Sequence, residues 1–356
     1  MVASPRSRRR LLIATFVATA LFLFFALRTP DALTGQLARP RPNPNPSRPG
    51  QTIDDDDDDV RSSSNKNDDS GKKNAAAAAA AAEDRELELV VASVKAENTS
   101  WFDTYLPEWH KNVYVADDPG AALTVPRNKG REAMVYLTYL IERYDSLPAA
   151  VVFVHASRFA WHNDDPDYDA LPALRRLRLP YLRREGYVNL RCVWVIGCPG
   201  EIRPAIDAAA DKPEVVTARH VYKQAFEELL PDVPLPDLVA VSCCSQFAVT
   251  RDAVRRRPRA DYVRYRDWLL ATPLDDALNG RVFEFAWHII FGKEAVHCPP
   301  AASCYCNVFG LCDLEPSCRD DSSCDGRYVL PPFSSLPKGW PLVGWQHEER
   351  NFTGPL

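Results

Sequence analysis

Two histidines and two carboxylates follow the apolar run 149–154, and these residue types can bind a metal or carry a proton. His155 ends the run, and His162, Asp164 and Asp165 fall within the next ten residues. Imidazole nitrogens and carboxylate oxygens are common metal ligands and acid–base groups. We therefore predict a metal or acid–base site with His155, His162 and Asp164 as ligands. The alternative, that these are buried polar groups that only hold the loop, stays open.

A glycine and an arginine stand where the clearest predicted helix, 130–144, begins. Asn128 can cap this helix, and Gly130 lets backbone approach closely. Free N–H groups at a helix start bind phosphate, and the Arg131 guanidinium could add a bidentate contact. The spacing therefore predicts a phosphate site at Asn128, Gly130 and Arg131. An ordinary helix cap with a surface ion pair is the alternative.

Glu284 and His288 lie four residues apart on a predicted helix, 276–291, and therefore share one face. This spacing suits an acid–base or metal pair. It also suits a plain ion pair on a helix. Trp287 and Phe291 are expected in the core.

The loop after the first predicted strand holds Glu97 and Trp101. The carboxylate could bind a ribose or a metal, and the indole could stack on a ring. The simpler alternative is a solvated glutamate beside a tryptophan that anchors the next helix.

Apolar strands alternate with helices after residue 87, which predicts an α/β sandwich around a mostly parallel sheet. The predicted strands are 87–94, 112–116, 149–154, 190–196 and 238–241. The predicted helices are 101–110, 130–144, 171–184, 220–230, 260–270 and 276–291. Sites in such sheets form beyond the carboxyl ends of strands, so we expect function in the loops after Val94, Val154 and Val241.

The N-terminus predicts a membrane anchor. Four arginines within residues 1–10 precede the uncharged run 11–27, which is long enough to span a thin bilayer. The excess of arginine before the run favours a cytosolic tail (1–10) and a type II orientation. A cleaved signal peptide is the alternative, but the apolar run is long and its end is a poor cleavage site. Either way, the rest of the chain enters the secretory pathway, and we expect Golgi or endoplasmic reticulum with the C-terminal domain luminal.

Residues 28–86 have the composition of a disordered stem, with a proline-rich stretch, six consecutive aspartates and eight alanines. The aspartates account for the formal net charge of −5, since the chain without them is near neutral, and 26% of residues are charged. Nothing in this balance predicts a nucleic-acid partner.

Ten cysteines predict disulfide bonds, because an even count in an oxidising compartment is typical of them. Six lie in 298–324, at the start of a cysteine-rich extension, 298–356, that follows the domain 87–297. A zinc site is the alternative, but paired C-x2-C knuckles are missing. Asn98 and Asn351 fit N-glycosylation sequons that a luminal domain could use.

Seven ordered motifs carry a family resemblance: ELVVA (88–92), NKGRE (128–132), LTYLIERYDSLP (137–148), VFVHA (152–156), WHN (161–163), CCSQFAVTR (243–251) and RVFEFAWHIIFG (281–292). Over residues 87–312 the chain resembles the largely fungal family catalogued as domain of unknown function 3431. This resemblance implies a fold more than a function.

A more distant similarity is to nucleotide-sugar glycosyltransferases of the single Rossmann-like (GT-A) type. It rests on the Asn-x-Gly-Arg-acidic helix start at 128–132, a strand that ends in a polar loop, and the segment 246–251 before an acidic helix. A type II anchor on a disordered stem is also common among Golgi glycosyltransferases. Where that superfamily carries Asp-x-Asp, this chain has His155-Ala156-Ser157.

This similarity implies a GT-A-like α/β fold: one Rossmann-like, mixed, mostly parallel sheet flanked by helices. It also implies a nucleotide sugar as substrate, a divalent metal such as manganese as cofactor, and a glycan or protein as acceptor. It suggests that Asn128, Gly130 and Arg131 bind the diphosphate and that Glu97 and Trp101 contact the nucleoside. His155, His162 and Asp164 would bind the metal or stabilise the leaving group. Gln246 and Arg251 would line the acceptor site, and Glu284 would act as general base.

The leading hypothesis is thus a luminal glycosyltransferase. A second hypothesis is a catalytically inert luminal domain that binds glycans or proteins. A third is a metal-dependent hydrolase built on the two histidines. A transferase requires Arg131, His155 and Glu284 to meet at one pocket.

Overall fold

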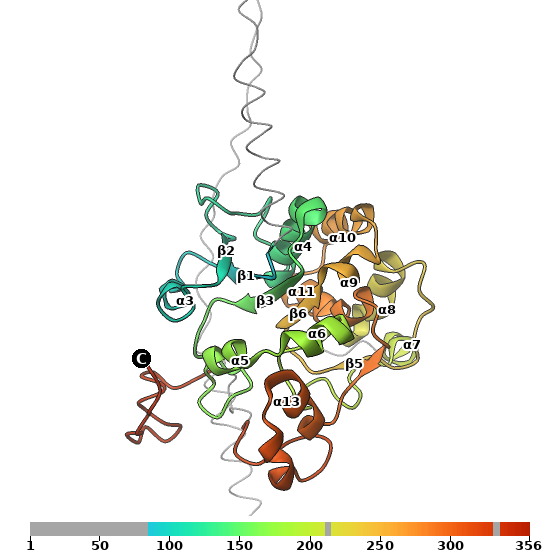
Figure 1. Ribbon diagram of the computed structural model, residues 1–356. Coiled ribbons are helices and arrows are strands. Elements are labelled where there is room, and N and C mark those ends of the chain that lie inside the picture. Colours follow the sequence, from blue (N-terminus) through green and yellow to red (C-terminus); the bar gives the residue numbers. More distant parts are fainter. Residues whose placement is uncertain (1–84, 211–214, 330–334) are drawn as a thin grey trace, which may run out of the picture. The chain divides into compact units, whose positions relative to one another are not determined.

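The structure, a computed structural model, describes residues 85–210, 215–329 and 335–356 (Figure 1). The predicted cytosolic tail (1–10), membrane anchor (11–27) and nearly all of the predicted stem (28–86) lie outside the described residues. Within the described residues, no helix is both long and apolar enough to cross a bilayer.

A five-stranded sheet in the order β2-β1-β3-β6-β4 forms the centre of the domain. The strands are β1 (Leu87–Ser93), β2 (His110–Val115), β3 (Ala150–His155), β4 (Tyr187–Asn189) and β6 (Phe247–Thr250). Strand β1 pairs in parallel with β2 and β3, and β6 pairs antiparallel with β3 and β4. All strands except β6 therefore run in one direction. The predicted α/β fold with a mixed, mostly parallel sheet is confirmed.

The register decides which loops meet. Leu87 pairs with Ala150 and Ala92 pairs with His155, so β1 and β3 end side by side. Thr250 pairs with Ala150, so the antiparallel strand β6 ends at the opposite edge of the sheet. The loops after β1 and β3 therefore share one edge, and residues after Thr250 lie at the other.

Helices cover both faces of the sheet because its central strands are apolar on both sides. Val90 and Phe153 pack into one core and Leu89 and Val91 into the other. The first core is closed by α4 (Glu132–Arg143), α8 (Ala218–Leu229), α9 (Arg251–Arg255), α10 (Arg259–Ala271), α11 (Asp276–Glu284) and α12 (Trp287–Ile290). The second is closed by α3 (Ser100–Tyr105), α5 (Ala170–Arg176), α6 (Leu179–Glu185) and α13 (Ala301–Phe309). Figure 1 shows α4, α10 and α11 grouped away from α5 and α13.

Short elements complete the domain. A separate two-stranded parallel sheet joins β5 (Ala240–Val241) to β7 (Val296–His297). The remaining helices of the described residues are α7 (Pro204–Ala209) and two 3-10 turns, η1 (Tyr144–Ser146) and η2 (Cys312–Ser317).

Several predicted boundaries are wrong. The predicted strand 190–196 is irregular, and the strand there is β4, which ends at Asn189. The predicted helix 171–184 is two helices, because Arg178 leaves the helical path to bond Val308 and Pro180 begins a new first turn. The predicted helix 276–291 breaks after Glu284. Strand β6 was not predicted at all, since its four residues are too short to show a period.

Five disulfides pair all ten cysteines, which confirms the disulfide prediction and leaves no thiol for zinc. Two of them, Cys192–Cys304 and Cys198–Cys298, join the C-terminal extension to the α/β domain. Such a set of disulfides indicates folding in an oxidising, secretory or extracellular environment.

The last described segment, 335–356, packs against the loop that follows β3. Tyr168 meets Trp340 and Trp345 with ring centroids 5.5 and 5.7 Å apart, and Phe159 meets Phe352 at 5.8 Å. Trp340 also donates a hydrogen bond to the carbonyl of Asp167. The extension therefore supports the loop that carries His162, the second candidate histidine.

Candidate functional site

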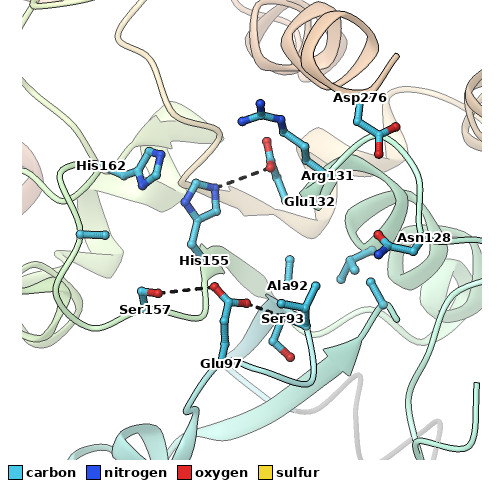
Figure 2. A pocket seen from close by; sticks show the side chains of 14 residues that line it. Ala92, Ser93, Glu97, Asn128, Arg131, Glu132, His155, Ser157, His162 and Asp276 are labelled. Carbon is cyan, nitrogen blue, oxygen red and sulfur yellow. Dashed lines mark hydrogen bonds and ion pairs between the residues drawn. The ribbon is translucent and has the colours of Figure 1, made fainter. Parts of the chain in front are cut away.

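A cavity of about 380 Å³ opens where β1 and β3 end, at the edge of the sheet predicted to carry function. Its walls come from the ends of β1 and β2, the start of α4, the loop after β3 and the start of α11 (Figure 2). The lining residues are Ala92, Ser93, Val94, Glu97, Ala116, Asn128, Arg131, Glu132, Val135, His155, Ser157, Ala160, His162 and Asp276. We call this the first cavity.

A second, polar cavity of about 50 Å³ adjoins the first. The two share four lining residues: Arg131, Glu132, His155 and His162. The second cavity adds Trp161 from the loop after β3, Cys244 from the loop after β5, and Ala277, Gly280, Arg281 and Glu284 from α11. Arg131, His155 and Glu284, which are far apart in the sequence, are thus brought to one place.

Glu132 is a functional candidate that sequence reasoning missed, as is Arg281, which lines the second cavity. Glu132 is the first residue of α4 and lines both cavities, and its Oε2 lies 3.8 Å from His155 Nε2 (Figure 2). Burial raises the pKa of its carboxyl, although the Ser245 hydroxyl and Arg131 oppose this shift. The motif NKGRE contained the signal, since Glu132 follows Arg131 directly. The sequence pattern by itself assigns no role to this carboxylate.

His155 lies at the end of β3 and keeps one ring nitrogen without a hydrogen-bond partner among the described residues. Its backbone N–H donates to Gln246 Oε1 at 3.1 Å, whereas its buried Nε2 makes no hydrogen bond and faces the Glu132 carboxylate at 3.8 Å. Burial lowers the pKa of His155 to about 4, against the opposing charges of Glu284 and Glu97. The imidazole is therefore neutral at neutral pH and can accept a proton or a hydrogen bond.

His162 contacts His155 edge to face, with ring centroids 4.8 Å apart. Burial, with the neighbouring His155, lowers the pKa of His162 well below its ordinary value. The pair is consequently neutral. Positive charge in the two cavities comes from Arg131 and Arg281 instead.

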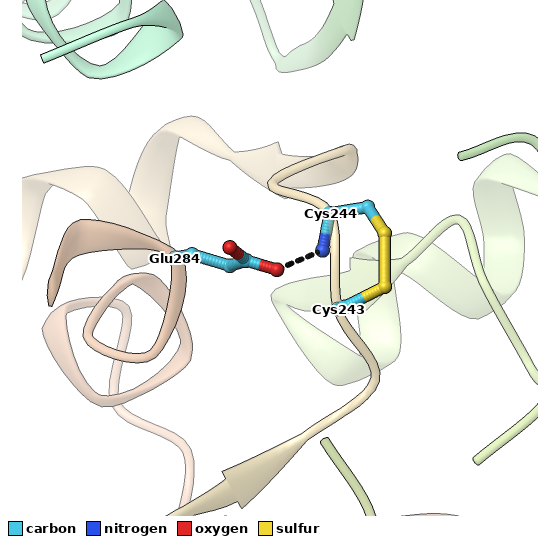
Figure 3. A group of neighbouring side chains, drawn as sticks. All are labelled: Cys243, Cys244 and Glu284. Atoms are coloured by element: carbon cyan, nitrogen blue, oxygen red, sulfur yellow. Dashed lines mark hydrogen bonds between the residues drawn. A yellow bond between two sulfur atoms is a disulfide. The ribbon is translucent and has the colours of Figure 1, made fainter. Parts of the chain in front are cut away.

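Glu284, the last residue of α11, is held at the second cavity by the backbone of a disulfide-bonded pair (Figure 3). Its Oε1 accepts a hydrogen bond from the Cys244 N–H at 2.6 Å, and its Oε2 lies 3.6 Å from Arg281 Nε. Cys243 and Cys244 are bonded to each other. Burial raises the pKa of the Glu284 carboxyl, with Arg281 opposing the shift. A fixed carboxylate with a raised pKa has the character of a general base.

The predicted metal ligands do not assemble. Asp164 is turned away from the histidines: its Oδ2 accepts from the N–H groups of Cys192 and Val193 at 2.7 and 3.2 Å, and its Oδ1 accepts from the Tyr305 hydroxyl at 2.7 Å. In the described part of the chain, the one group with three ligand atoms within 4.8 Å of one another is Cys243, Cys244 and Glu284. Its two sulfurs form a disulfide, so only the carboxylate could ligate. The side chains present do not fit a three-ligand divalent-metal centre.

The predicted phosphate site at the start of α4 is only partly present. Gly130 does not line either cavity, and its N–H donates to Asp276 Oδ1 at 2.9 Å. Its φ of 73° and a would-be Cβ contact of 2.6 Å with Leu269 explain the glycine instead. Asn128 and Arg131 do reach the first cavity. An anion there would meet the Arg131 side chain, because the backbone N–H of Gly130 is already occupied.

Of the remaining predicted residues, only Glu97 lines the first or the second cavity. Its Oε2 accepts from the Val94 N–H at 2.9 Å, and its Oε1 lies 3.4 Å from the Ser157 hydroxyl (Figure 2). Trp101 is buried and donates to the Ala156 carbonyl at 2.8 Å, so it anchors α3 and cannot stack on a ligand. Gln246 is buried between His155 and Asn163. Arg251 bonds the Leu147 carbonyl at the opposite edge of the sheet.

Asn98 and Asn351 are both exposed, and their glycosylation stays a prediction. His288 is fully buried and its Nε2 lies 3.0 Å from the Ala295 carbonyl, so it does not form a pair with Glu284 in the cavity.

No curated protein and no solved structure matches the chain. A family model does: the family described as "Protein of unknown function (DUF3431)" matches residues 89–307, a span that contains all the residues lining the two cavities. The chain therefore belongs to the DUF3431 family.

Proposed function

We propose that the domain is a glycosyltransferase that moves a sugar from a nucleotide sugar to a hydroxyl of a glycan or protein. The observation that carries this proposal is the meeting of Arg131, His155 and Glu284 at two joined cavities beyond the ends of β1 and β3. A carboxylate base, a guanidinium and a pocket of nucleoside size are the parts that such a transfer needs.

The first cavity is the proposed donor site. Its volume of about 380 Å³ lies within the ordinary range for small-molecule pockets. Ala92, Val94 and Ala116 supply apolar walls for a nucleoside, and Glu97 offers a carboxylate to ribose hydroxyls. Arg131, at the junction with the second cavity, would bind the diphosphate through its planar fork.

The second cavity is the proposed reaction centre. Glu284 takes the proton from the acceptor hydroxyl as the oxygen attacks the anomeric carbon of the donor. The new C–O bond forms while the bond from that carbon to the diphosphate breaks, and the diphosphate leaves with the electron pair. Arg131 and Arg281 stabilise the negative charge that develops on it. His155 and Glu132, 3.8 Å apart, fix the polar wall beside the reacting carbon.

This route uses the chain's own residues for the leaving group. The strand end carries His155-Ala156-Ser157, and no three-ligand set surrounds the histidines in the described residues. We therefore derive no step through a metal ion.

The proposal includes a place in the cell. The arginine-flanked run 11–27 would anchor the chain as a type II protein, and the disulfide-bonded domain would face the lumen of the Golgi or endoplasmic reticulum. The pairing of all ten cysteines supports the luminal side.

A melting experiment tests the donor site. The full-length chain, purified in detergent, is melted with each nucleotide sugar and nucleoside diphosphate, with and without manganese. A donor at about a hundred times its dissociation constant stabilises the fold by ~2.7 kcal/mol, which raises the melting temperature visibly. The shift should disappear in Arg131→Gln and persist in Arg127→Gln, an exposed control on the same loop that lines neither cavity. If no nucleotide shifts the well-folded wild-type chain, the donor site is refuted and a glycan- or protein-binding domain becomes the better account.

A further inference from the structure

A third cavity, of about 340 Å³, lies beyond the reaction centre. It is formed by the start of α8, the segment before α7 and the end of α11. Arg281 lines both this cavity and the second, as Arg131 lines both the second and the first. The three cavities therefore follow one another, with the small polar one in the middle.

This order matches the needs of a two-substrate reaction. The outer cavities, about 380 and 340 Å³, are each large enough for a sugar or nucleoside, whereas the middle one, about 50 Å³, holds little more than the reacting groups. Glu284, the proposed base, lines the middle cavity one helical turn after Arg281. A hydroxyl reaching Glu284 from the third cavity would approach from the side away from the donor.

The lining of the third cavity indicates what it binds. Arg219 and Arg281 have side chains 47% and 44% exposed, so both guanidinium groups are open to a ligand. Glu201 lies 3.4 Å from Arg219 and is the carboxylate that lines this cavity. Ile202 and Phe285 give a buried apolar floor. Two guanidinium forks above an apolar floor suit a sugar ring that carries an anionic group.

We propose that the third cavity binds the acceptor, and that the acceptor is a saccharide bearing a carboxylate or a phosphate. This proposal rests on the proposed transferase function and replaces the acceptor residues expected from the sequence, since Gln246 is buried and Arg251 lies at the opposite edge of the sheet. Arg219 lines the third cavity but neither of the other two, so its substitution tests the acceptor site without changing the reaction centre.

The test compares Arg219→Gln with Arg203→Gln in the full-length chain. Arg203 is an exposed neighbour that lines none of the three cavities, so it controls for the loss of a surface charge. Calorimetric titration uses three matched oligosaccharides that end in a uronic acid, a sugar phosphate or a neutral sugar. We expect the wild type to bind one or both anionic forms and Arg219→Gln to bind them at least about tenfold more weakly. Arg203→Gln should match the wild type, and the donor-induced melting shift should be unchanged in both variants.

The outcomes separate the two proposals. Where the donor shift is present, three results overturn the acceptor site and leave the transferase proposal intact. These are equal affinity for neutral and anionic oligosaccharides, no binding of any of the three, and no difference between the two variants. The absence of a donor shift overturns both, even where an anionic saccharide binds. Preference for the uronic acid or for the phosphate identifies the source of the negative charge.

Discussion

One loop of the molecule contributes residues to two regions that contain the same residue types but differ in how those side chains are hydrogen-bonded. The loop after β3, 156–169, contributes His162 to the proposed reaction centre, the second cavity, whose histidines and carboxylates are Glu132, His155, His162 and Glu284. It also contributes to a loop anchor, defined as Arg158, Asn163, Asp164, Asp169 and Gln246. Both regions are rich in polar side chains; the loop anchor is buried, whereas the reaction centre is only partly buried.

The loop anchor is fully bonded. Arg158 and Asp169 form a buried two-pronged ion pair at 3.0 and 2.8 Å. Asn163 donates to the carbonyls of Arg158 and Tyr168 and accepts from Gln246. Asp164 accepts three hydrogen bonds. Buried polar groups that are satisfied in this way hold a backbone in place and offer nothing to a ligand.

The reaction centre is the opposite case. His155 Nε2 is buried without a hydrogen bond, and the pKa values of Glu132 and Glu284 are raised by burial. A buried nitrogen without a hydrogen bond and two carboxyls with raised pKa values, gathered at one cavity, are typical of functional sites. In this loop, therefore, whether a polar side chain has its hydrogen bonds satisfied distinguishes a functional residue from a structural one better than its residue type does.

The largest expected effect is on turnover by Glu284→Gln. The amide keeps the shape and can still accept the hydrogen bond from Cys244, but it cannot take a proton. We expect kcat for transfer to fall about 10²–10⁴-fold while the donor-induced melting shift persists. Glu185→Gln, at a carboxylate that lines none of the three cavities, is the control. Transfer at the wild-type rate in Glu284→Gln would remove this residue from the role of base.

Substitutions in the loop anchor should lower the stability of the fold and not the rate of transfer. Asp164→Asn replaces a charged acceptor of three hydrogen bonds, so we expect the free energy of unfolding to fall by about 2–4 kcal/mol. Asp103→Asn, at a side chain 79% exposed, should change it by less than about 0.5 kcal/mol. Urea denaturation measures both. Unchanged stability, with loss of a manganese-dependent melting shift, would instead support the metal role predicted from the sequence.

A pH titration of stability tests whether His155 is held neutral. Its pKa is lowered to about 4 in the fold, so the unfolded chain binds the proton first as pH falls. The free energy of unfolding should therefore fall between about pH 6.5 and pH 4, and His155→Asn should reduce the loss between about pH 7 and pH 5 by ~1–2 kcal/mol. The raised carboxyl pKa values of Glu132 and Glu284 act in the opposite direction, in both proteins alike. Denaturation curves with the same pH slope in both would show an imidazole open to solvent.

Much of the fold could be predicted from the sequence, because the apolar strands 87–94 and 149–154 and the amphipathic helix 130–144 have clear periods. The shared edge after β1 and β3 followed from them. Strand β6 could not be predicted, since four buried residues, Phe247–Thr250, carry no period and depend on β3 and β4 for pairing. The break after Glu284 is likewise decided by tertiary packing.

The candidate site was predictable only in part. Arg131, His155, His162, Glu97 and Glu284 reach the cavities as expected. Asp164, Gln246 and Trp101 were plausible by type, but their bonding partners come from distant segments that the sequence does not place. Tyr305, for example, lies 141 residues from Asp164 and takes one of its oxygens. Glu132 was missed because a glutamate in the first turn of a helix is ordinarily a capping residue.

Removing the disulfide between the adjacent cysteines, Cys243 and Cys244, tests whether catalysis depends on the fixed position of Glu284. Cys244 has a φ of 91°, a conformation rare for residues other than glycine, and the bond to Cys243 keeps its N–H on Glu284. Replacing both cysteines by serine should lower kcat about tenfold, which corresponds to ~1.4 kcal/mol, with donor binding retained. The control removes Cys306–Cys312, which is not part of any of the three cavities. Equal losses in both variants would indicate general destabilisation.

The smallest effect concerns Gly280, which brings α11 close to Arg131. A Cβ at this position would lie 3.2 Å from Arg131 Cδ and 3.3 Å from both Arg131 Cγ and the Gly130 carbonyl oxygen, so Gly280→Ala should push the guanidinium a few tenths of an ångström from the proposed diphosphate. We expect donor affinity to weaken about threefold, or ~0.6 kcal/mol, with kcat nearly unchanged. Gly120→Ala, on an exposed loop, is the control. Because alanine also favours the helix, the variant should melt no lower than the wild type, which separates a displaced arginine from a damaged fold. Unchanged donor affinity would mean that donor binding does not require the position of Arg131 that its contact with α11 sets.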